Sequence, residues 1–166
     1  SAYQGRGLEA DVELAVTDDG RLLAVRARLH ADLGSYLIAT TAIPAHTTAM
    51  LITGAYDIPA ADVTITGART HKVPTGPYRG AGRPEAAYLI ERMVDEAARE
   101  LDLDPIDLRR RNLVHTFPHQ TPVIMAYDAG DYHPSLKKAM DLADVKGFAQ
   151  SIGYPLMLKA AAGGGG

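Results

Sequence analysis

The stretch PYRGAGRPEAAYLIERMVDEAARE, residues 77–100, runs from a glycine-rich loop directly into a helix. Pro84 suits the first helical turn because its missing N–H has no partner there. Glu85 lies favourably at the positive end of the helix dipole. The apolar residues that follow recur at three- and four-residue steps, which predicts one buried stripe made of Leu89, Ile90, Met93, Val94, Ala97 and Leu101.

Upstream of this helix, alternation of apolar and polar residues predicts strands. Residues 10–17 and 21–29 alternate on either side of Asp18-Asp19-Gly20, the pattern of a β-hairpin with a tight turn. Residues 36–53 show no clean period and predict a mixture of loop and short helix. Residues 61–68 alternate again and predict a further strand.

Downstream, two more helix starts are visible. Asp104-Pro105 is an N-cap followed by proline and opens a short helix through Arg111, and Asp131 precedes another helix over about 134–145. The order of elements predicts an α+β unit in which helices pack on one face of a mixed sheet.

Composition excludes several function classes. The 166 residues are 46% hydrophobic and 22% charged, as in a globular protein, and the net charge of −3 provides no basic field for nucleic acid. Without cysteine the chain has no disulfide, cysteine nucleophile or cysteine-held metal. No targeting segment is visible, and Pro44 and His46 interrupt the longest weakly polar stretch, so we predict no membrane span and a cytoplasmic location.

The loop over residues 77–83 permits two interpretations. Glycines before a helix N-terminus allow backbone N–H groups to converge on an anion, and Arg79 and Arg83 add guanidinium groups suited to oxyanions. Alternatively, the glycines make a tight turn and the arginines are solvated. Spacing alone leaves the two interpretations about equally favoured, because neither a Walker loop nor a dinucleotide fingerprint is present.

The longer string PYRGAGRPEAAYLIERMVDEAARELDLDPIDLRRRNLV resembles the signature of the xanthine dehydrogenase/aldehyde oxidase family. It is most similar to the bacterial branch that includes the large subunit of aerobic carbon monoxide dehydrogenase. The resemblance continues through GRLLAVRARLHADLGSYL, TGAYDIPAADVTITGARTHKVPTG and YDAGDYHPSLKKAMDLADVKGF, over about residues 3–148. It implies a partial molybdopterin-binding domain over residues 1–148 and an unrelated tail over 149–166.

The resemblance also implies roles for individual residues. Arg79 contacts the cofactor, with Tyr78 and Gly80 beside it. Gly80 takes the place of the cysteine of carbon monoxide dehydrogenases, which argues against carbon monoxide oxidation. Ala81 and Thr47 fall where xanthine-oxidising members have a stacking phenylalanine and a substrate-binding arginine. Since neither group is present, a small aldehyde or an N-heterocycle is favoured over a purine.

By the same resemblance, the complete subunit binds molybdenum as molybdopterin cytosine dinucleotide and hydroxylates its substrate with water as the oxygen source. Its partners are an iron–sulfur subunit and an FAD subunit, in a heterotrimer that dimerises. The family's catalytic glutamate belongs to a motif that we do not find here, and Glu85 and Glu91 are interpreted as helix residues. We therefore assign no catalytic residue and expect the isolated chain to be inactive. The alternative is a non-catalytic binding or scaffold protein of the same fold.

The C-terminal stretch SIGYPLMLKAAAGGGG, residues 151–166, resembles instead the nucleotide-binding strand and glycine loop of biotin carboxylase, an ATP-grasp enzyme. That resemblance implies ATP contacts by Lys159, Gly163 and Gly164. A flexible linker is the alternative, and both ends of the chain are interpreted as cuts. An ATP-dependent carboxylase fragment ranks below the other hypotheses because it explains few residues. We predict no metal site at His115-x-x-x-His119, where Pro118 argues against a helix.

Overall fold

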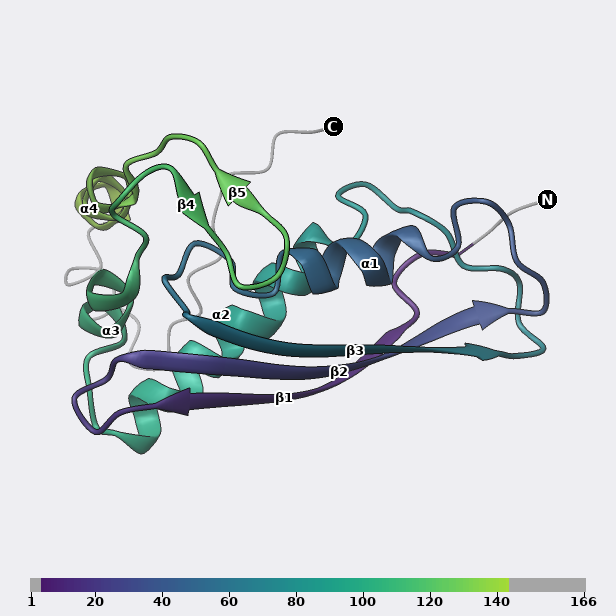
Figure 1. Ribbon diagram of the computed structural model, residues 1–166, viewed down its shortest axis with the longest axis horizontal. Coiled ribbons are helices and arrows are strands. Elements are labelled where there is room, and N and C mark those ends of the chain that lie inside the picture. Colours follow the sequence, from purple (N-terminus) through teal and green to yellow (C-terminus); the bar gives the residue numbers. More distant parts are fainter. Residues whose placement is uncertain (1–3, 144–166) are drawn as a thin grey trace. The chain divides into compact units, whose positions relative to one another are not determined.

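The fold is organised around a three-stranded sheet in the order β1-β2-β3 (Figure 1). The computed structural model describes residues 4–143. The strands are β1 (Leu8–Val16), β2 (Leu22–Gly34) and β3 (Ala60–Arg69). β1 pairs with β2 antiparallel and β2 pairs with β3 parallel, which confirms the predicted hairpin and the mixed sheet.

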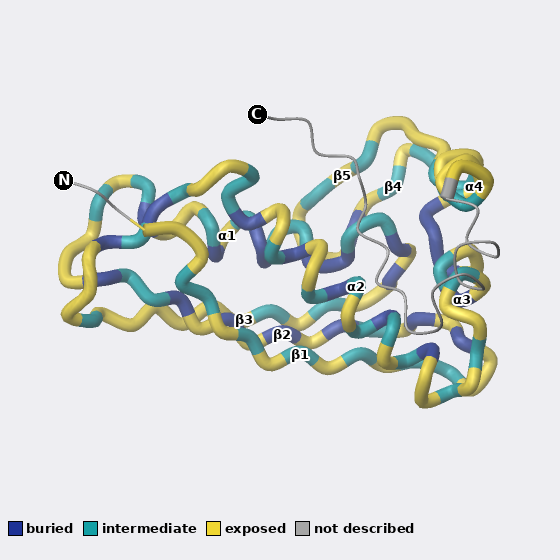
Figure 2. The backbone as a smooth tube through the Cα atoms, turned by 180° about the vertical axis from the view of Figure 1, so that it is seen from behind, coloured by how far each residue is buried: buried dark blue, intermediate teal, exposed yellow. Residues whose placement is uncertain are grey.

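Two helices cover one face of this sheet, α1 (Ile43–Met50) and α2 (Arg83–Glu100) (Figure 1). The face they cover is apolar because β2 alternates: Val25, Ala27 and Leu29 are buried, whereas the residues between them are exposed (Figure 2). The exposed face of the sheet instead carries cross-strand ion pairs, in which Arg26 bridges Glu13 and Asp62.

The buried stripe of α2 differs from the predicted one. Ile90 and Val94 are buried as predicted, but the other fully buried positions are Ala86 and Ala98. These four residues form a single i, i+4 row along one side of the helix. The predicted Leu89, Met93, Ala97 and Leu101 are only partly buried, because they lie to one side of that row.

The third helix, α3 (Pro105–Asn112), starts as predicted: the Asp104 carboxylate accepts hydrogen bonds from the amides of Ile106 and Asp107. Arg109 of α3 reaches across to Glu91 and Asp95 of α2, at 2.8 Å from each carboxylate. The short strands β4 (His119–Gln120) and β5 (Ala126–Tyr127) follow.

One compact unit ends at Tyr132 and another begins at His133, so α4 (Tyr132–Ala143) is described by itself. The predicted domain boundary at residue 148 lies outside the described residues and stays a prediction. Among the helices of the described part of the chain, none combines the length and the apolar character needed to cross a membrane.

A buried asparagine ties the β1–β2 turn to α3. Asn112 is 4% exposed, and its side-chain amide donates to the carbonyls of Gly20 and Leu108, both at 2.8 Å. Its side-chain oxygen accepts from the amide of Leu22 at 2.9 Å. Gly20 itself has φ +82°, a conformation in which a side chain is strained.

We predict that Asn112→Ala lowers the free energy of unfolding by about 2–4 kcal/mol, because it leaves buried backbone groups without partners. Urea denaturation measures the change. Arg111→Ala, at the exposed neighbouring position, is the control and is expected to stay within about 0.5 kcal/mol of the parent. Equal effects of the two substitutions would contradict the assigned role of Asn112.

Candidate functional site

The glycine-rich loop has an unusual backbone over three consecutive residues. Gly80, Ala81 and Gly82 have φ angles of +92°, +42° and +95°. Two tight turns accompany them: the amide of Ala81 donates to Tyr78 at 2.7 Å, and the amide of Arg83 donates to Gly80 at 3.0 Å. The left-handed segment delivers the chain directly into the first turn of α2, so the loop and the helix N-terminus form one continuous feature.

One side of this loop is pressed against α1. A Cβ atom on Gly82 would lie 2.2 Å from the carbonyl oxygen of Pro44 and 2.9 Å from Cβ of Thr47. The Thr48 hydroxyl donates to the carbonyls of Pro44 at 2.8 Å and Gly82 at 3.2 Å. Only glycine permits this approach, which brings α1, with the half-buried Thr47, beside Ala81 and Gly82.

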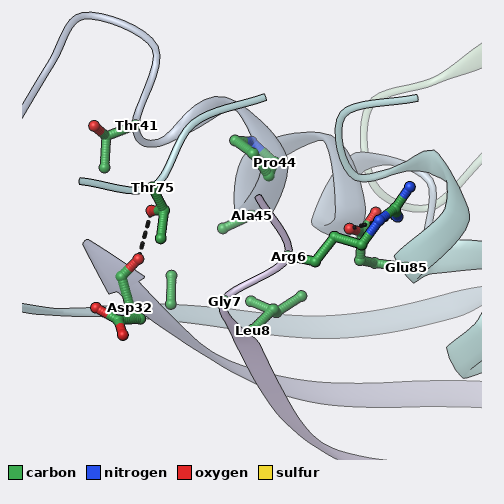
Figure 3. Close-up of a pocket in the computed structure, with 10 residues that line it drawn as sticks. Arg6, Gly7, Leu8, Asp32, Thr41, Pro44, Ala45, Thr75 and Glu85 are labelled. Atoms are coloured by element: carbon green, nitrogen blue, oxygen red, sulfur yellow. Dashed lines mark hydrogen bonds and ion pairs between the residues drawn. The ribbon is translucent and has the colours of Figure 1, made fainter. Parts of the chain in front are cut away.

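The other side of the loop meets the segment before β1. Gln4 donates its amide to Pro74 at 3.0 Å and accepts at its carbonyl from Gly76 at 2.9 Å. Arg6 then pairs with Glu85 at 3.0 Å (Figure 3). No local pattern in the sequence marks Arg6, because the loop that it contacts lies more than seventy positions away.

The loop exposes a donor set suited to an anionic, oxygen-rich group. Tyr78 is 62% exposed and Arg79 is also exposed, next to glycine backbone and the N-terminus of an 18-residue helix. Guanidinium, phenol and helix N-terminus all favour oxyanions. The predicted cofactor contacts Tyr78, Arg79 and Gly80 are consecutive, and the predicted pocket residues Ala81 and Thr47 lie next to them.

Below the loop is a small cavity of about 20 Å³ (Figure 3). Its volume corresponds to about one water molecule, so it is not a substrate pocket. It is lined by Arg6, Thr41, Pro44, Thr75 and Glu85, among others.

A second charged group fixes the chain between β3 and the loop. The Asp32 carboxylate accepts hydrogen bonds from Lys72 at 2.9 Å, from the hydroxyl of Thr70 at 2.7 Å and from the amide of Gly34 at 2.9 Å. In that order of importance, these three donors lower the pKa of Asp32 to about 2. The carboxylate therefore pins residues 70–72 to the end of β2.

Glu91 takes part in a structural network. The Tyr56 hydroxyl donates to it at 2.7 Å and Arg109 pairs with it at 2.8 Å. Burial, followed by the nearby Glu91 charge, raises the pKa of Tyr56. These contacts agree with the interpretation of Glu91 as a helix residue that holds α2 to its neighbours.

Within residues 4–143, no group of three or more histidine, aspartate or glutamate side chains is arranged to hold a metal ion. The predicted ATP contacts Lys159, Gly163 and Gly164 lie outside the described residues. The matches of this chain to known proteins do not bear out the biotin carboxylase resemblance.

Comparison with known proteins identifies the family. The sequence-family model for the molybdopterin cofactor-binding domain matches residues 1–113. The carbon monoxide dehydrogenase large chain of Hydrogenophaga pseudoflava is 41% identical over 148 residues, which cover 84% of this chain and 18% of that protein. The nicotine 6-hydroxylase large subunit of Paenarthrobacter nicotinovorans is 33% identical over 140 residues, 82% of this chain and 17% of that subunit.

A solved structure agrees with these matches. Quinoline 2-oxidoreductase from Pseudomonas putida 86 superposes with a TM-score of 0.84 at 30% identity, over 90% of this chain and 20% of that chain. This chain therefore belongs to the molybdopterin cofactor-binding domain family, as its sequence predicts. It spans less than a fifth of the length of the two curated relatives.

We predict that Gly82→Ala lowers the free energy of unfolding by more than about 2 kcal/mol, since the methyl group meets the Pro44 carbonyl and a positive φ is strained in alanine. Ala81→Gly is the matched control. It is expected to stay within about 1 kcal/mol, because relief of strain offsets the greater freedom of glycine in the unfolded chain. Chemical denaturation of both variants tests the pair, and a harmless Gly82→Ala would contradict the close approach.

We predict a pH dependence that comes from Asp32. Because its pKa in the folded chain is lowered from an ordinary value near 3.8 to about 2, its contribution to stability is present above about pH 4 and is lost as the pH falls through 2. Asp32→Asn should lower the thermal midpoint above pH 4 and flatten its fall towards pH 2. Asp18→Asn, in the exposed turn, is the control. Parallel pH profiles for Asp32→Asn and the parent would refute the assignment.

Proposed function

We propose that this chain forms one wall of the molybdenum cofactor site in the large subunit of a molybdenum hydroxylase. The observation that carries the proposal is the left-handed loop over residues 80–82, which joins the exposed Tyr78 and Arg79 to the N-terminus of α2. Family membership supports the same reading, because the matched region includes this loop.

Each loop residue has a distinct part in binding. Arg79 supplies a planar fork of N–H donors for cofactor oxygens, which a lysine could not reproduce. Gly80 lets the group approach the backbone, since it has no side chain in the way. Tyr78 flanks the same surface and offers a phenol hydroxyl. The cofactor supplies the redox chemistry of substrate hydroxylation when it is bound, and these residues hold and orient it.

The residues beside the loop favour a small aldehyde or an N-heterocycle as the substrate. Ala81 and Thr47 are small and uncharged, so they provide neither a stacking ring nor a cation for a purine. The names of two of the relatives, nicotine 6-hydroxylase and quinoline 2-oxidoreductase, refer to N-heterocycles. Gly80 and the absence of cysteine count against carbon monoxide, despite the similarity to carbon monoxide dehydrogenase.

The complete protein, in this proposal, carries molybdopterin as the cytosine dinucleotide and works in the cytoplasm. It assembles with an iron–sulfur subunit and an FAD subunit into a heterotrimer that dimerises. Relatives named as large chains or large subunits support an assembly of this kind. The family's catalytic-glutamate motif is not found in these 166 residues, so the chain alone is expected not to turn over substrate.

The test measures molybdenum and pterin in the full-length, assembled protein. We predict that Arg79→Ala lowers cofactor occupancy, with an affinity loss of about tenfold or more, because a charge-assisted contact contributes about 1.5–3 kcal/mol. Arg28→Ala, on the exposed face of β2, is the control and should keep its molybdenum. A well-folded parent protein without molybdenum would refute the proposed function and favour the scaffold alternative.

A further inference from the structure

The left-handed segment over residues 80–82 carries no large side chain of its own, so its conformation has to be fixed by neighbours. The contact of Gly82 with α1 fixes one side. On the other side, a single guanidinium group contacts the chain both before and after the segment. That group belongs to Arg6, which precedes β1.

Arg6 makes three contacts with the loop. Its Nη1 pairs with Glu85 Oε1 at 3.0 Å, and its Nη2 donates to the carbonyl oxygen of Arg79 at 3.3 Å. Its guanidinium lies 5.0 Å from the ring centroid of Tyr78, within range for a cation–π interaction. Arg79 precedes the left-handed segment and Glu85 follows it, so the guanidinium spans both of its ends.

The backbone around Arg6 holds the guanidinium in this place. Gln4 exchanges hydrogen bonds with Pro74 and Gly76, and the carbonyl of Gly7 accepts from the amide of Asp32 at 2.8 Å. A Cβ atom on Gly5 would lie 2.6 Å from Cβ of Tyr78, so glycine permits the two segments to run side by side. Arg6 itself has φ +64°, which directs the chain between these two anchors.

The mostly buried carboxylate of Glu85 makes the start of α2 sensitive to the loss of Arg6. The Glu85 side chain is only 14% exposed and stands in the first turn of α2. Among the described residues its Oε2 atom is buried and accepts no hydrogen bond. Without the guanidinium, a mostly buried carboxylate would lose the partner that compensates its burial, and the helix start would shift to let it reach water.

We infer that Arg6 is a positioning residue of the cofactor site: it sets the conformation of residues 78–85 in which Arg79 and Gly80 face the bound group. The inference rests on the proposed function. Arg6 acts through the loop, by the pairing with Glu85 (Figure 3), the hydrogen bond to the Arg79 carbonyl and the contact with the Tyr78 ring. A lysine keeps the charge but cannot make all three contacts at once.

The test compares Arg6→Ala, Arg6→Lys and Glu85→Gln in the full-length, assembled protein. The control is Arg26→Ala, which removes ion pairs on the exposed face of the sheet. Amide hydrogen exchange is followed in a peptide that covers residues 78–90 and in one that covers α3. Molybdenum and pterin per subunit are measured on the same samples.

For Arg6→Ala we expect exchange at least tenfold faster in the loop peptide, unchanged exchange in the α3 peptide and a severalfold loss of cofactor. Arg6→Lys should recover part of both losses, and Arg26→Ala should match the parent. Loop exchange and cofactor content equal to the parent in Arg6→Ala would overturn the inference. If Arg6→Ala does not fold, unchanged loop exchange in both Arg6→Lys and Glu85→Gln would overturn it instead.

The two proposals fail in different ways. A parent protein without molybdenum refutes the proposed function, and the measurement of molybdenum and pterin in the variants then has no meaning. Amide hydrogen exchange in the loop peptide still reports whether Arg6 fixes the conformation of the loop. If the parent has its normal cofactor content, and Arg6→Ala keeps both that content and the slow amide exchange of the loop peptide, only the role of Arg6 is refuted.

Discussion

The close approach of Gly82 to α1 is the constraint on which the rest of the candidate site depends. A Cβ atom on Gly82 would lie only 2.2 Å from the carbonyl oxygen of Pro44, so the loop and α1 cannot move closer together. The Thr48 hydroxyl also donates to the carbonyls of Pro44 and Gly82. This contact fixes where α2 begins. It therefore also fixes the direction of the helix dipole and the start of the buried row from Ala86 to Ala98. The exposed residues 78 and 79 are positioned as a consequence.

Local signals in the sequence predicted the elements well, because each one depends on a few adjacent residues. Alternation predicted the hairpin and β3, and Pro84 and Asp104 marked helix starts within a residue or two. The buried face of α2 was predicted less well. Hydrophobicity favoured Leu89 and Met93, whereas close packing selected Ala86 and Ala98, and the space available to a side chain is a tertiary property.

In the candidate site too, some residues could be predicted from the sequence and the contacts that hold them could not. Resemblance to a family pointed to Arg79, Gly80 and Thr47, and α1 does lie against the loop. The interactions that hold the loop could not be predicted, because they join residues far apart in the sequence. Arg6 and Glu85 are separated by 79 positions, and Thr48 and Gly82 by 34. Asn112 likewise joins the end of α3 to a turn about ninety positions away, a link that no local pattern in the sequence marks.

Strand topology explains why such distant residues meet. β2 and β3 are parallel, so their carboxyl ends, Gly34 and Arg69, lie at the same edge of the sheet, and both connections to the helices start there (Figure 1). β1 is antiparallel to β2, with Leu8 opposite Ala31, so the residues before β1 reach that same edge. A mixed sheet of this order thus brings Arg6 to the chain that follows β3. The hairpin therefore decides which residue can support the loop.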